Sequence, residues 1–341
     1  MPEPRLPFIA VVSINRDKYS ETFIQGAFDA LPFRKVLLYG GYLPTHVTQD
    51  WRVEGEELPN AVTPFWKKKP QSPLDQATAN LRRWLKANKP DAVLCNYGPS
   101  GVMLTALLHE LRIPMVVHFH GYDAYRADIL QSYGKDYPQL FSSAAGIVAS
   151  SAHMREQLIG LGAPPHKVHT CIYGIRLEDF QERPMPDGPF TCLFVGRFVA
   201  KKRPLMALEA MRHLRDSGRE LHLRMVGEGE LLESCKSWAK ENGLESSVEF
   251  LGALPPDAVA AEMGRAHVVL IPSLTAADGD SEGTPLVLME AAACGRPVIA
   301  FRTPGSRMSS MRVSQGSFWR RTKEQPHWRM RFGPWKMIGC S

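Results

Sequence analysis

The chain alternates between short apolar runs and segments with helical periodicity. Apolar runs typical of buried parallel strands lie at residues 7–14, 35–40, 91–95, 114–119, 146–150 and 168–172. Helical patterns separate several of these runs, and the first helix is expected to open near Ser20. This alternation predicts an α/β protein with a doubly wound parallel sheet.

A second strand and helix series follows a break in the pattern. Residues 176–189 are charged and rich in proline, and their apolar residues follow neither helical nor strand periodicity, which predicts an interdomain linker. Further strands are expected at residues 190–195, 221–226, 248–252 and 267–272. We therefore expect a Rossmann-like domain over residues 1–175, the linker, and a second Rossmann-like domain over residues 190–305.

One part of the first domain departs from the pattern. Residues 41–73 contain prolines, tryptophans and the run Lys67-Lys68-Lys69, and they show no clear periodicity. We expect a solvated loop there; a surface that meets an acceptor or a membrane is the alternative.

A helix near the end of the second domain concentrates candidate chemistry. Thr284 is expected as its N-cap and Pro285 as its first residue, while Gly295 marks its end. Residues 285–294 are apolar except for Glu290. A carboxylate on an apolar helix needs water or a hydrogen-bonding ligand, so a solvent-facing residue and a ligand site both remain open.

Two loops could hold an anion. Glu282 and Gly283 precede that helix, whose first backbone N–H groups attract negative charge. Gly196 ends a predicted strand, and Arg197 and Lys202 follow it just before a helix. Fixed cations in front of a helix suit a diphosphate, although a solvated basic loop fits the same pattern.

His118-Phe119-His120-Gly121-Tyr122-Asp123 closes a predicted strand, at the edge where open α/β sheets bind ligands. His120 is a candidate ligand contact, and a structural histidine is the alternative. Because side chains alternate along a strand, we expect His118 and His120 to point to opposite faces and not to share a metal. Asp278-Gly279-Asp280 is also not expected to bind metal.

Composition narrows the class of protein. The chain has 341 residues, 44% of them hydrophobic, which is enough for two cores. Its six cysteines show no metal or redox spacing and predict neither a zinc site nor a disulfide framework, which favours a reducing compartment. No basic leader or long apolar run is found, so we expect a cytoplasmic protein.

The net charge of +6 arises at the C-terminal end. Residues 306–341 hold eight Lys and Arg but one acid, and the remainder is about neutral, so nucleic acid is not an expected partner. This tail is rich in Arg, Trp and Met and has no period, and the abrupt change predicts a truncated or frameshifted C-terminus with an incomplete second domain. A basic tail that binds an anionic membrane is the alternative.

Three motifs together resemble the family-four (group 1) glycosyltransferases, over about residues 8–305. They are the acidic motif from Glu282 to Glu290, the element with Gly196, Arg197 and Lys202, and the HGYD sequence at His120. The resemblance implies a GT-B fold of two Rossmann-like domains and a retaining transfer of sugar to a hydroxyl acceptor. The donor would be a nucleotide diphosphate sugar, with no metal or cofactor.

The same resemblance implies individual roles. Arg197 and Lys202 would neutralise the donor diphosphate, Glu290 would hold the ribose, Glu282 would position the donor sugar, and His120 would contact the sugar being transferred. The other donor-site positions would be Gly196, Gly283, Thr284 and Pro285. Details of these motifs resemble bacterial exopolysaccharide transferases, including those of colanic acid assembly. This implies a glycan or lipid-linked oligosaccharide acceptor and a peripheral contact with the inner face of the membrane.

Other functions remain open. An inactive nucleotide-binding remnant, a sugar-nucleotide epimerase and a phosphorylase of related architecture would share these motifs in part. No lysine stands out as a carrier of pyridoxal phosphate. A nicotinamide dehydrogenase is disfavoured, because no G-x-G-x-x-G follows the first strand.

Overall fold

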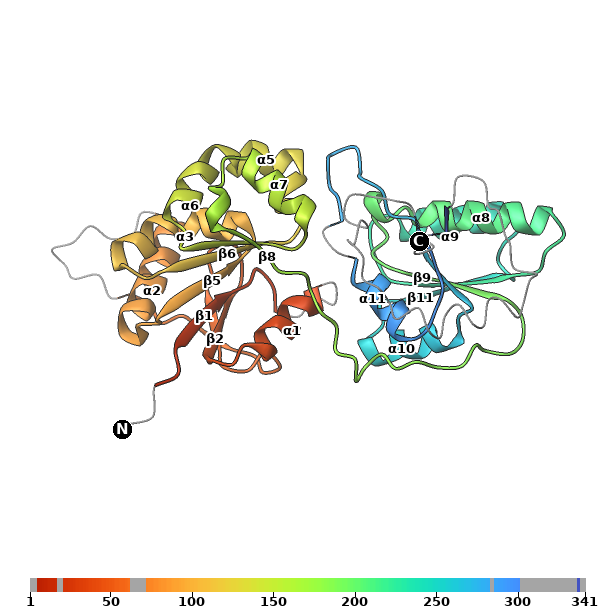
Figure 1. Ribbon diagram of the computed structural model, residues 1–341, viewed down its shortest axis with the longest axis horizontal. Coiled ribbons are helices and arrows are strands. Elements are labelled where there is room, and N and C mark those ends of the chain that lie inside the picture. The colour runs from red at the N-terminus through yellow and green to blue at the C-terminus, as the bar shows by residue number, and fades with distance from the viewer. Residues whose placement is uncertain (1–4, 17–20, 62–71, 283–284, 301–335, 338–341) are drawn as a thin grey trace. The chain divides into compact units, whose positions relative to one another are not determined.

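The chain forms two compact units, Met1–Tyr173 and Gly174–Ser341. The computed structural model describes residues 5–16, 21–61, 72–282, 285–300 and 336–337. Each unit is built on one sheet with helices on both of its faces (Figure 1). The predicted α/β class is therefore confirmed.

The first sheet has eight strands in the order β4-β3-β2-β1-β5-β6-β7-β8. The strands are β1 (Phe8–Val12), β2 (Arg34–Tyr39), β3 (His46–Thr48), β4 (Glu56–Glu57), β5 (Ala92–Asn96), β6 (Met115–Phe119), β7 (Gly146–Ala149) and β8 (Val168–Thr170). From β2 through β8 all neighbours pair in parallel, as the apolar runs predict.

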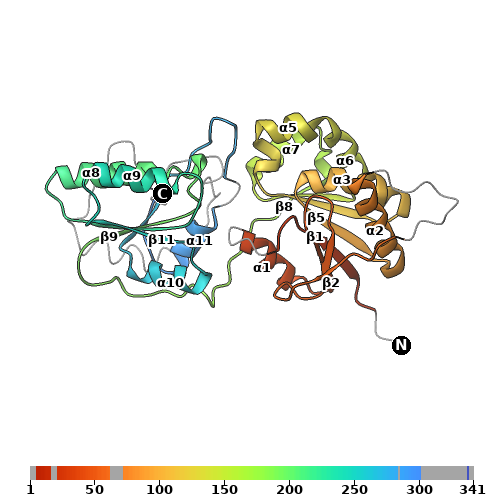
Figure 2. The same ribbon diagram turned by 180° about the vertical axis from the view of Figure 1, so that it is seen from behind.

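Helices cover this sheet from both sides. They are α1 (Thr22–Ala30), α2 (Pro73–Asn88), α3 (Gly98–Leu111), α4 (Tyr122–Tyr125), α5 (Ala127–Tyr133), α6 (Tyr137–Ser143) and α7 (Ala152–Gly160), with short 3-10 turns at Gly134–Asp136 and Pro165–Lys167. Figures 1 and 2 show α1 on one face and α3, α6 and α7 on the other. Each face has its own buried core, one including Phe28 and Trp51 and the other Leu104 and Phe141.

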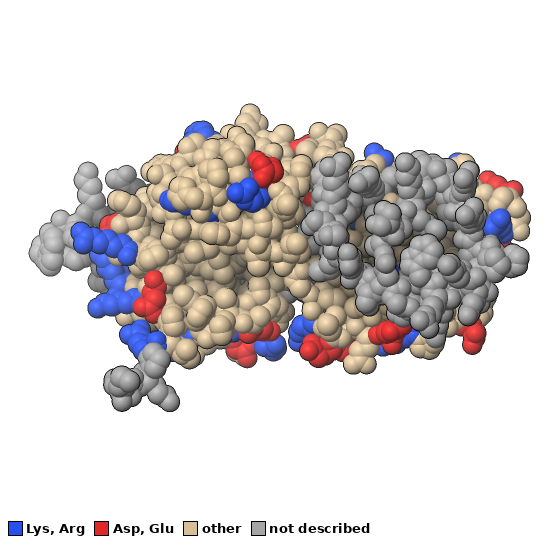
Figure 3. Space-filling model, viewed as in Figure 1, with Lys and Arg blue, Asp and Glu red and all other residues tan. Residues whose placement is uncertain are grey.

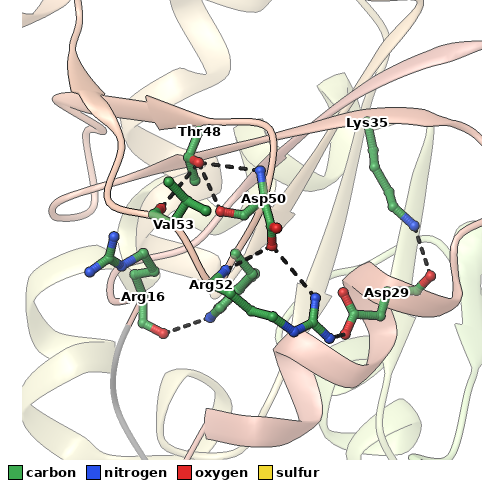
Figure 4. Close-up of polar contacts among 8 residues, drawn as sticks. Arg16, Asp29, Lys35, Thr48, Asp50, Arg52 and Val53 are labelled. Atoms are coloured by element: carbon green, nitrogen blue, oxygen red, sulfur yellow. Dashed lines mark hydrogen bonds and ion pairs between the residues drawn. The ribbon is translucent and has the colours of Figure 1, made fainter.

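The expectation of a solvated loop over residues 41–73 is wrong in part. β3 pairs antiparallel with β2, and β4 with β3, so this segment extends the sheet. Trp51 is 4% exposed and donates a 2.7 Å hydrogen bond to the carbonyl of Arg16. The Thr48 hydroxyl closes the turn through the carbonyls of Asp50 and Val53 (Figure 4). Strands of two and three residues are too short for periodicity to reveal, and residues 67–69 lie outside the described part.

The second sheet has six strands in the order β11-β10-β9-β12-β13-β14. The strands are β9 (Thr191–Val195), β10 (His222–Val226), β11 (Val248–Gly252), β12 (Val268–Ile271), β13 (Val298–Ala300) and β14 (Lys336–Met337). All pair in parallel except β14, which runs antiparallel to β13. Apart from β14, the predicted aberrant tail, residues 306–341, lies outside the described residues.

Among the described residues of the second unit, two helices lie on each face of the sheet. They are α8 (Pro204–Asp216), α9 (Leu232–Glu241), α10 (Pro256–Arg265) and α11 (Leu286–Ala293), with a 3-10 turn, η4, at Ala200–Lys202. Figure 1 shows α8 and α9 on one face and α10 and α11 on the other. A separate apolar core lies under each pair.

The segment expected as a linker, residues 176–189, has neither helix nor strand. Part of it nevertheless packs on the second unit, because Phe180 is 6% exposed and belongs to the core under α10 and α11. Arg296, which is 2% exposed, donates hydrogen bonds to the carbonyls of Arg183 at 3.0 Å and Pro184 at 2.7 Å. The guanidinium thus fastens the segment to the turn after α11.

Candidate functional site

Two loops of the second unit meet at the carboxyl edge of its sheet. β9 and β12 are parallel neighbours, so the loop from Gly196 to η4 and the loop from Pro272 to α11 leave the sheet on the same side. The backbone N–H of Leu274 donates to the carbonyl of Lys201 at 2.9 Å. The Lys201 ammonium lies 2.9 Å from Asp280 Oδ1, and both side chains are nearly buried. These contacts fix the acidic loop against η4.

The next lysine pairs with the next acid along. Lys202 Nζ lies 3.0 Å from Glu282 Oε1, with side chains 16% and 10% exposed. At this distance the two oppositely charged side chains form an ion pair. Burial raises the pKa of Glu282, but the charges of Lys202, Lys201 and Arg197 outweigh it and lower the pKa below its ordinary value. Glu282 is therefore an ionised carboxylate with its charge matched by a cation.

Arg197 is the cation of this group that keeps its charge available. Within the described part of the chain, its guanidinium forms no ion pair or side-chain hydrogen bond, although it is close enough to lower the pKa of Glu282. Gly196, which precedes it, donates its N–H to Val226 at 3.0 Å. A Cβ at Gly227 would lie 2.0 Å from the Gly196 carbonyl oxygen, so the loops after β9 and β10 touch through their backbones.

Glu290 is the second candidate acid, on α11. Burial raises its pKa to about 7, and the charge of Lys202 opposes that rise. Among the described residues its carboxylate has no hydrogen-bonding partner. The carboxylate is thus partly protonated near neutral pH and could accept hydrogen bonds from hydroxyl groups.

The start of α11 differs from the expectation by one residue. The helix begins at Leu286, and Pro285 is its N-cap with an extended ψ of 105°. The expected N-cap Thr284 and its neighbour Gly283 lie outside the described residues. Gly295, with a φ of +69°, ends the helix as predicted, because this left-handed conformation favours glycine.

The aspartates of the D-G-D sequence serve the loop itself. Asp280 binds Lys201 through its carboxylate, and its N–H donates to Asp278 Oδ1 at 3.0 Å. The sequence did not single out Lys201 as a candidate, because the choice between two adjacent lysines depends on the direction of the η4 turn. Nowhere in the described ranges do three or more His, Cys, Asp or Glu side chains gather in a way that could hold a metal ion.

The first unit contains a histidine cluster at the carboxyl end of β6. His120 Nε2 lies 2.9 Å from Asn96 Oδ1, and Nδ1 hydrogen bonds with the Tyr173 hydroxyl. The ring of His118 lies 4.2 Å from that of His120 between centroids, so the expectation of opposite faces is wrong. Residues two apart in a strand share a face, and only immediate neighbours alternate.

Both histidines are held as neutral imidazoles. Burial lowers the pKa of His118 to about 4. Burial, reinforced by the neighbouring His118, holds the pKa of His120 well below its ordinary range. His118 Nε2 is buried without a hydrogen-bonding partner among the described residues.

Asp123 organises the loop that carries His120. Its carboxylate is fully buried and accepts backbone N–H groups from Gly98 at 3.0 Å, His120 at 3.0 Å and Gly121 at 2.9 Å. Burial raises its pKa to about 6, although these N–H groups act in the opposite direction. The HGYD sequence is thus a turn closed on its own aspartate, and the turn directs His120 toward β5.

Comparison with known families assigns both units. Residues 39–179 match the model for glycosyltransferase family 4, and residues 175–309 match the model for glycosyl transferases group 1. Glycosyltransferase models thus match the chain in both of its halves, over residues 39–309 in total. The predicted resemblance is confirmed at the level of the family.

Curated relatives include exopolysaccharide enzymes. The chain is 35% identical over 219 residues to the amylovoran biosynthesis glycosyltransferase AmsK of Erwinia amylovora, covering 63% of this chain and 54% of that protein. It is 33% identical over 216 residues to the putative colanic acid biosynthesis glycosyltransferase WcaL of Escherichia coli K12, covering 62% and 53%. The chain thus spans about half the length of these relatives.

Solved structures agree on the fold. Anabaena Alr3699/HepE, in complex with UDP and glucose, superposes with a TM-score of 0.68 at 18% identity, covering 87% of this chain and 81% of that one. Sucrose-phosphate synthase from Thermosynechococcus elongatus gives a TM-score of 0.68 at 16% identity, covering 88% and 82%. Together with the two family matches, these structures confirm the expected GT-B fold. In the described part of the chain, no helix combines the length and apolar character needed to cross a membrane.

Proposed function

We propose that this glycosyltransferase moves a sugar from a nucleotide diphosphate sugar to a hydroxyl acceptor, with retention at the anomeric carbon, in the synthesis of exopolysaccharide or another cell-surface glycan. The observation that carries the proposal is the pairing of Lys202 with Glu282 beside Arg197, at the carboxyl edge of the second sheet. Relatives named for amylovoran and colanic acid biosynthesis support the glycan class.

The diphosphate would be held by cations from the loop after β9. The guanidinium of Arg197 forms no ion pair with a described residue and could bind the diphosphate directly. The ammonium of Lys202 could bind the diphosphate in place of Glu282 after a small movement of its side chain. Positive charge at this point stabilises the negative charge that grows on the departing diphosphate, which is the electrostatic task of the reaction. The backbone N–H groups at the start of α11 would add to it. The proposal therefore requires neither metal nor cofactor.

The two glutamates would bind hydroxyl groups. An ionised Glu290 can accept hydrogen bonds from both hydroxyls of a ribose, which would offset the burial that raises its pKa. Glu282, once a diphosphate takes Lys202, would turn to a hydroxyl of the donor sugar. His120 is proposed to hydrogen bond with the same sugar.

In the transfer step, the bond between the anomeric carbon and the diphosphate oxygen breaks. The acceptor oxygen forms the new bond on the same face of the sugar, and its proton passes to the departing diphosphate. The electron pair of the broken bond leaves with the nucleoside diphosphate, so no oxidant or reductant is needed.

The acceptor is proposed to be a glycan or lipid-linked oligosaccharide reached from a peripheral position on the inner face of the membrane. Figure 3 shows Lys and Arg side chains along one margin of the first unit, near α2, which carries Arg82, Arg83 and Lys86. Such a margin suits an anionic surface. Cosedimentation with anionic vesicles, using the chain with and without residues 306–341, tests the contact, and failure of both forms to bind would refute it.

Nucleotide binding tests the proposed function directly. We expect UDP or GDP to raise the temperature of cooperative unfolding, because a ligand that binds the native state stabilises it. Arg197→Ala should remove most of this shift, while Arg219→Ala, an exposed arginine of the same unit, should keep it. Saturable binding without transfer from any nucleotide sugar would favour a binding module. No shift with either nucleotide would contradict the proposal.

A further inference from the structure

His120 is hydrogen-bonded on both ring nitrogens by residues from other elements of the first unit. Asn96 ends β5, the strand beside β6, and contributes Oδ1 at 2.9 Å from Nε2. Tyr173 follows β8 and contributes its hydroxyl to Nδ1. The motif at His120 predicts neither partner, because both lie far from it in the sequence. These two contacts determine the protonation pattern of the imidazole.

The orientation of the Asn96 amide is fixed by a second contact. Asn96 is 3% exposed, and its Nδ2 donates to the carbonyl of Val12 at 2.9 Å. A flipped amide would set two oxygens against each other, so Oδ1 must face His120. A carbonyl oxygen can only accept, and the proton between the two side chains therefore belongs to Nε2 of His120.

The other nitrogen follows from the first. A neutral imidazole with its proton on Nε2 has an acceptor at Nδ1, so the Tyr173 hydroxyl must donate to it. Burial raises the pKa of Tyr173 well above its ordinary value, which keeps that hydroxyl protonated. Donors and acceptors thus run in one direction, from Tyr173 through His120 and Asn96 to the carbonyl of Val12. Hydrogen bonds aligned in this way reinforce one another.

We propose that Asn96 and Tyr173 are positioning residues that fix the proton of His120 on Nε2 and hold the ring in one orientation. The relevance of this fixed tautomer to sugar transfer rests on the proposed function. A hydroxyl that takes the place of Asn96 must accept from Nε2–H, and one that takes the place of Tyr173 must donate to Nδ1. Asn96 and Tyr173 thus make one ring nitrogen of His120, Nε2, a hydrogen-bond donor and the other, Nδ1, an acceptor.

The surroundings of His120 favour the neutral ring. The groups that face it are His118 from β6, Tyr97 after β5, Tyr173 after β8, and Phe23 from α1. The nearby carboxylates are engaged elsewhere: Asp123 accepts the backbone N–H of His120, and Glu21 hydrogen bonds with Tyr97 and Asn15. Within the described residues no carboxylate contacts the imidazole, so nothing there stabilises a second proton.

Nitrogen NMR of the full chain with ¹⁵N-labelled histidine tests the proposal. The signals of His120 are identified as those missing from His120→Gln. We expect one protonated and one unprotonated nitrogen, assigned as Nε2–H and Nδ1, with a pattern that stays constant between about pH 5 and 8, where an ordinary histidine titrates. A ring protonated on Nδ1, or on both nitrogens at neutral pH, would overturn the proposal.

Two variants then assign the cause. Tyr173→Phe removes the donor to Nδ1 and should give mixed tautomers. Asn96→Asp places a carboxylate at Nε2 and should produce a doubly protonated ring at neutral pH. Tyr125→Phe is the matched control, because Tyr125 stacks on His153 at 5.7 Å, and no hydrogen bond between them is found in the described structure. If Tyr173→Phe folds and leaves the His120 pattern unchanged, Tyr173 has no positioning role.

These spectra need no nucleotide, acceptor or transfer. A chain that fails to bind nucleotide but shows the fixed tautomer would refute the proposed function and leave this inference standing. A chain that binds nucleotide but shows mixed tautomers would refute this inference and leave the proposed function standing.

Discussion

Lys202 Nζ lies 3.0 Å from Glu282 Oε1, and this ion pair links the loops after β9 and β12. Since both side chains are nearly buried, water screens their attraction poorly. The neighbouring pair of Lys201 and Asp280, at 2.9 Å, holds the same two loops. One basic turn thus engages two successive acids of the opposite loop.

Replacing Lys202 with Met should weaken binding of a nucleoside diphosphate by roughly 10- to 100-fold, which corresponds to the about 1.5–3 kcal/mol of a hydrogen bond to a charged group. Isothermal titration calorimetry with UDP and GDP measures it. Lys236→Met is the matched control, because Lys236 pairs with Glu233 at the surface, where the side chains are 44% and 81% exposed. An unchanged affinity in Lys202→Met would exclude Lys202 from the diphosphate site.

Replacing Glu282 with Gln should have the opposite effect on a nucleotide that carries no sugar. The neutral amide releases Lys202, so UDP or GDP no longer competes with a carboxylate, and its affinity should rise several-fold. Sugar transfer should fall, because a neutral amide oxygen accepts the sugar hydroxyl more weakly than the proposed carboxylate acceptor does. Calorimetry and a transfer assay on one preparation provide both readings. A parallel loss of UDP and GDP affinity would show that Glu282 supports the site and does not compete for it.

Glu290 should make nucleotide affinity depend on pH. In the proposed complex the ribose hydroxyls would donate to an ionised Glu290, whose pKa is raised to about 7 by burial. Affinity should therefore increase as the pH rises through about 7 and level off above it. Glu290→Gln should remove this dependence. Nucleotide affinity measured as a function of pH for the parent and for Glu290→Gln tests the prediction. A profile in Glu290→Gln as steep as in the parent would assign the dependence to another group.

The same group affects the protein without nucleotide. Because the pKa of Glu290 is raised from 4.5 to about 7 by folding, the native state binds the extra proton between these values. This contribution to stability is fully present below 4.5 and is lost as the pH rises through 7. Between pH 4.5 and about 7, the unfolding free energy of the parent should therefore decrease relative to that of Glu290→Gln as the pH rises.

Arg296→Ala should destabilise the second unit by about 3 kcal/mol, since it removes the charged hydrogen bonds that a buried guanidinium donates to two backbone carbonyls. Urea unfolding followed by fluorescence measures the loss. Arg176→Ala lies in the same segment but breaks only an exposed pair with Asp179, so it should cost less than about 1 kcal/mol. Equal losses in the two variants would mean that the buried guanidinium is not a fastening point.

The sequence predicts the strands well where they are buried on both faces. β1, β5 and β6 lie within the apolar runs, or within one residue of them, because a central parallel strand needs four or more apolar residues in succession. β3 and β4 escape prediction because they are the short outermost two strands on one side of the sheet, joined by a turn around Trp51. Their formation depends on tertiary contacts that no local pattern encodes.

The sequence likewise predicts some residues of the candidate site and misses others. Motif spacing singles out Arg197, Lys202 and Glu282, which the fold brings to one sheet edge. It misses Lys201, whose partner Asp280 becomes evident only from the η4 turn. It also places His118 on the wrong face, because the alternation of a strand was applied to residues two apart.

The pairing of Lys202 with Glu282 also bears on selectivity. Any anion that binds Lys202 must first displace an ionised, nearly buried carboxylate, and that carboxylate then needs hydrogen-bond donors of its own. Inorganic phosphate supplies the negative charge but few donors for the acid, so the exchange remains unfavourable. A nucleotide sugar supplies both, with phosphate oxygens for the lysine and hydroxyls for the glutamate. At the proposed donor site, the ion pair would thus discriminate against simple anions by requiring two kinds of partner in one molecule.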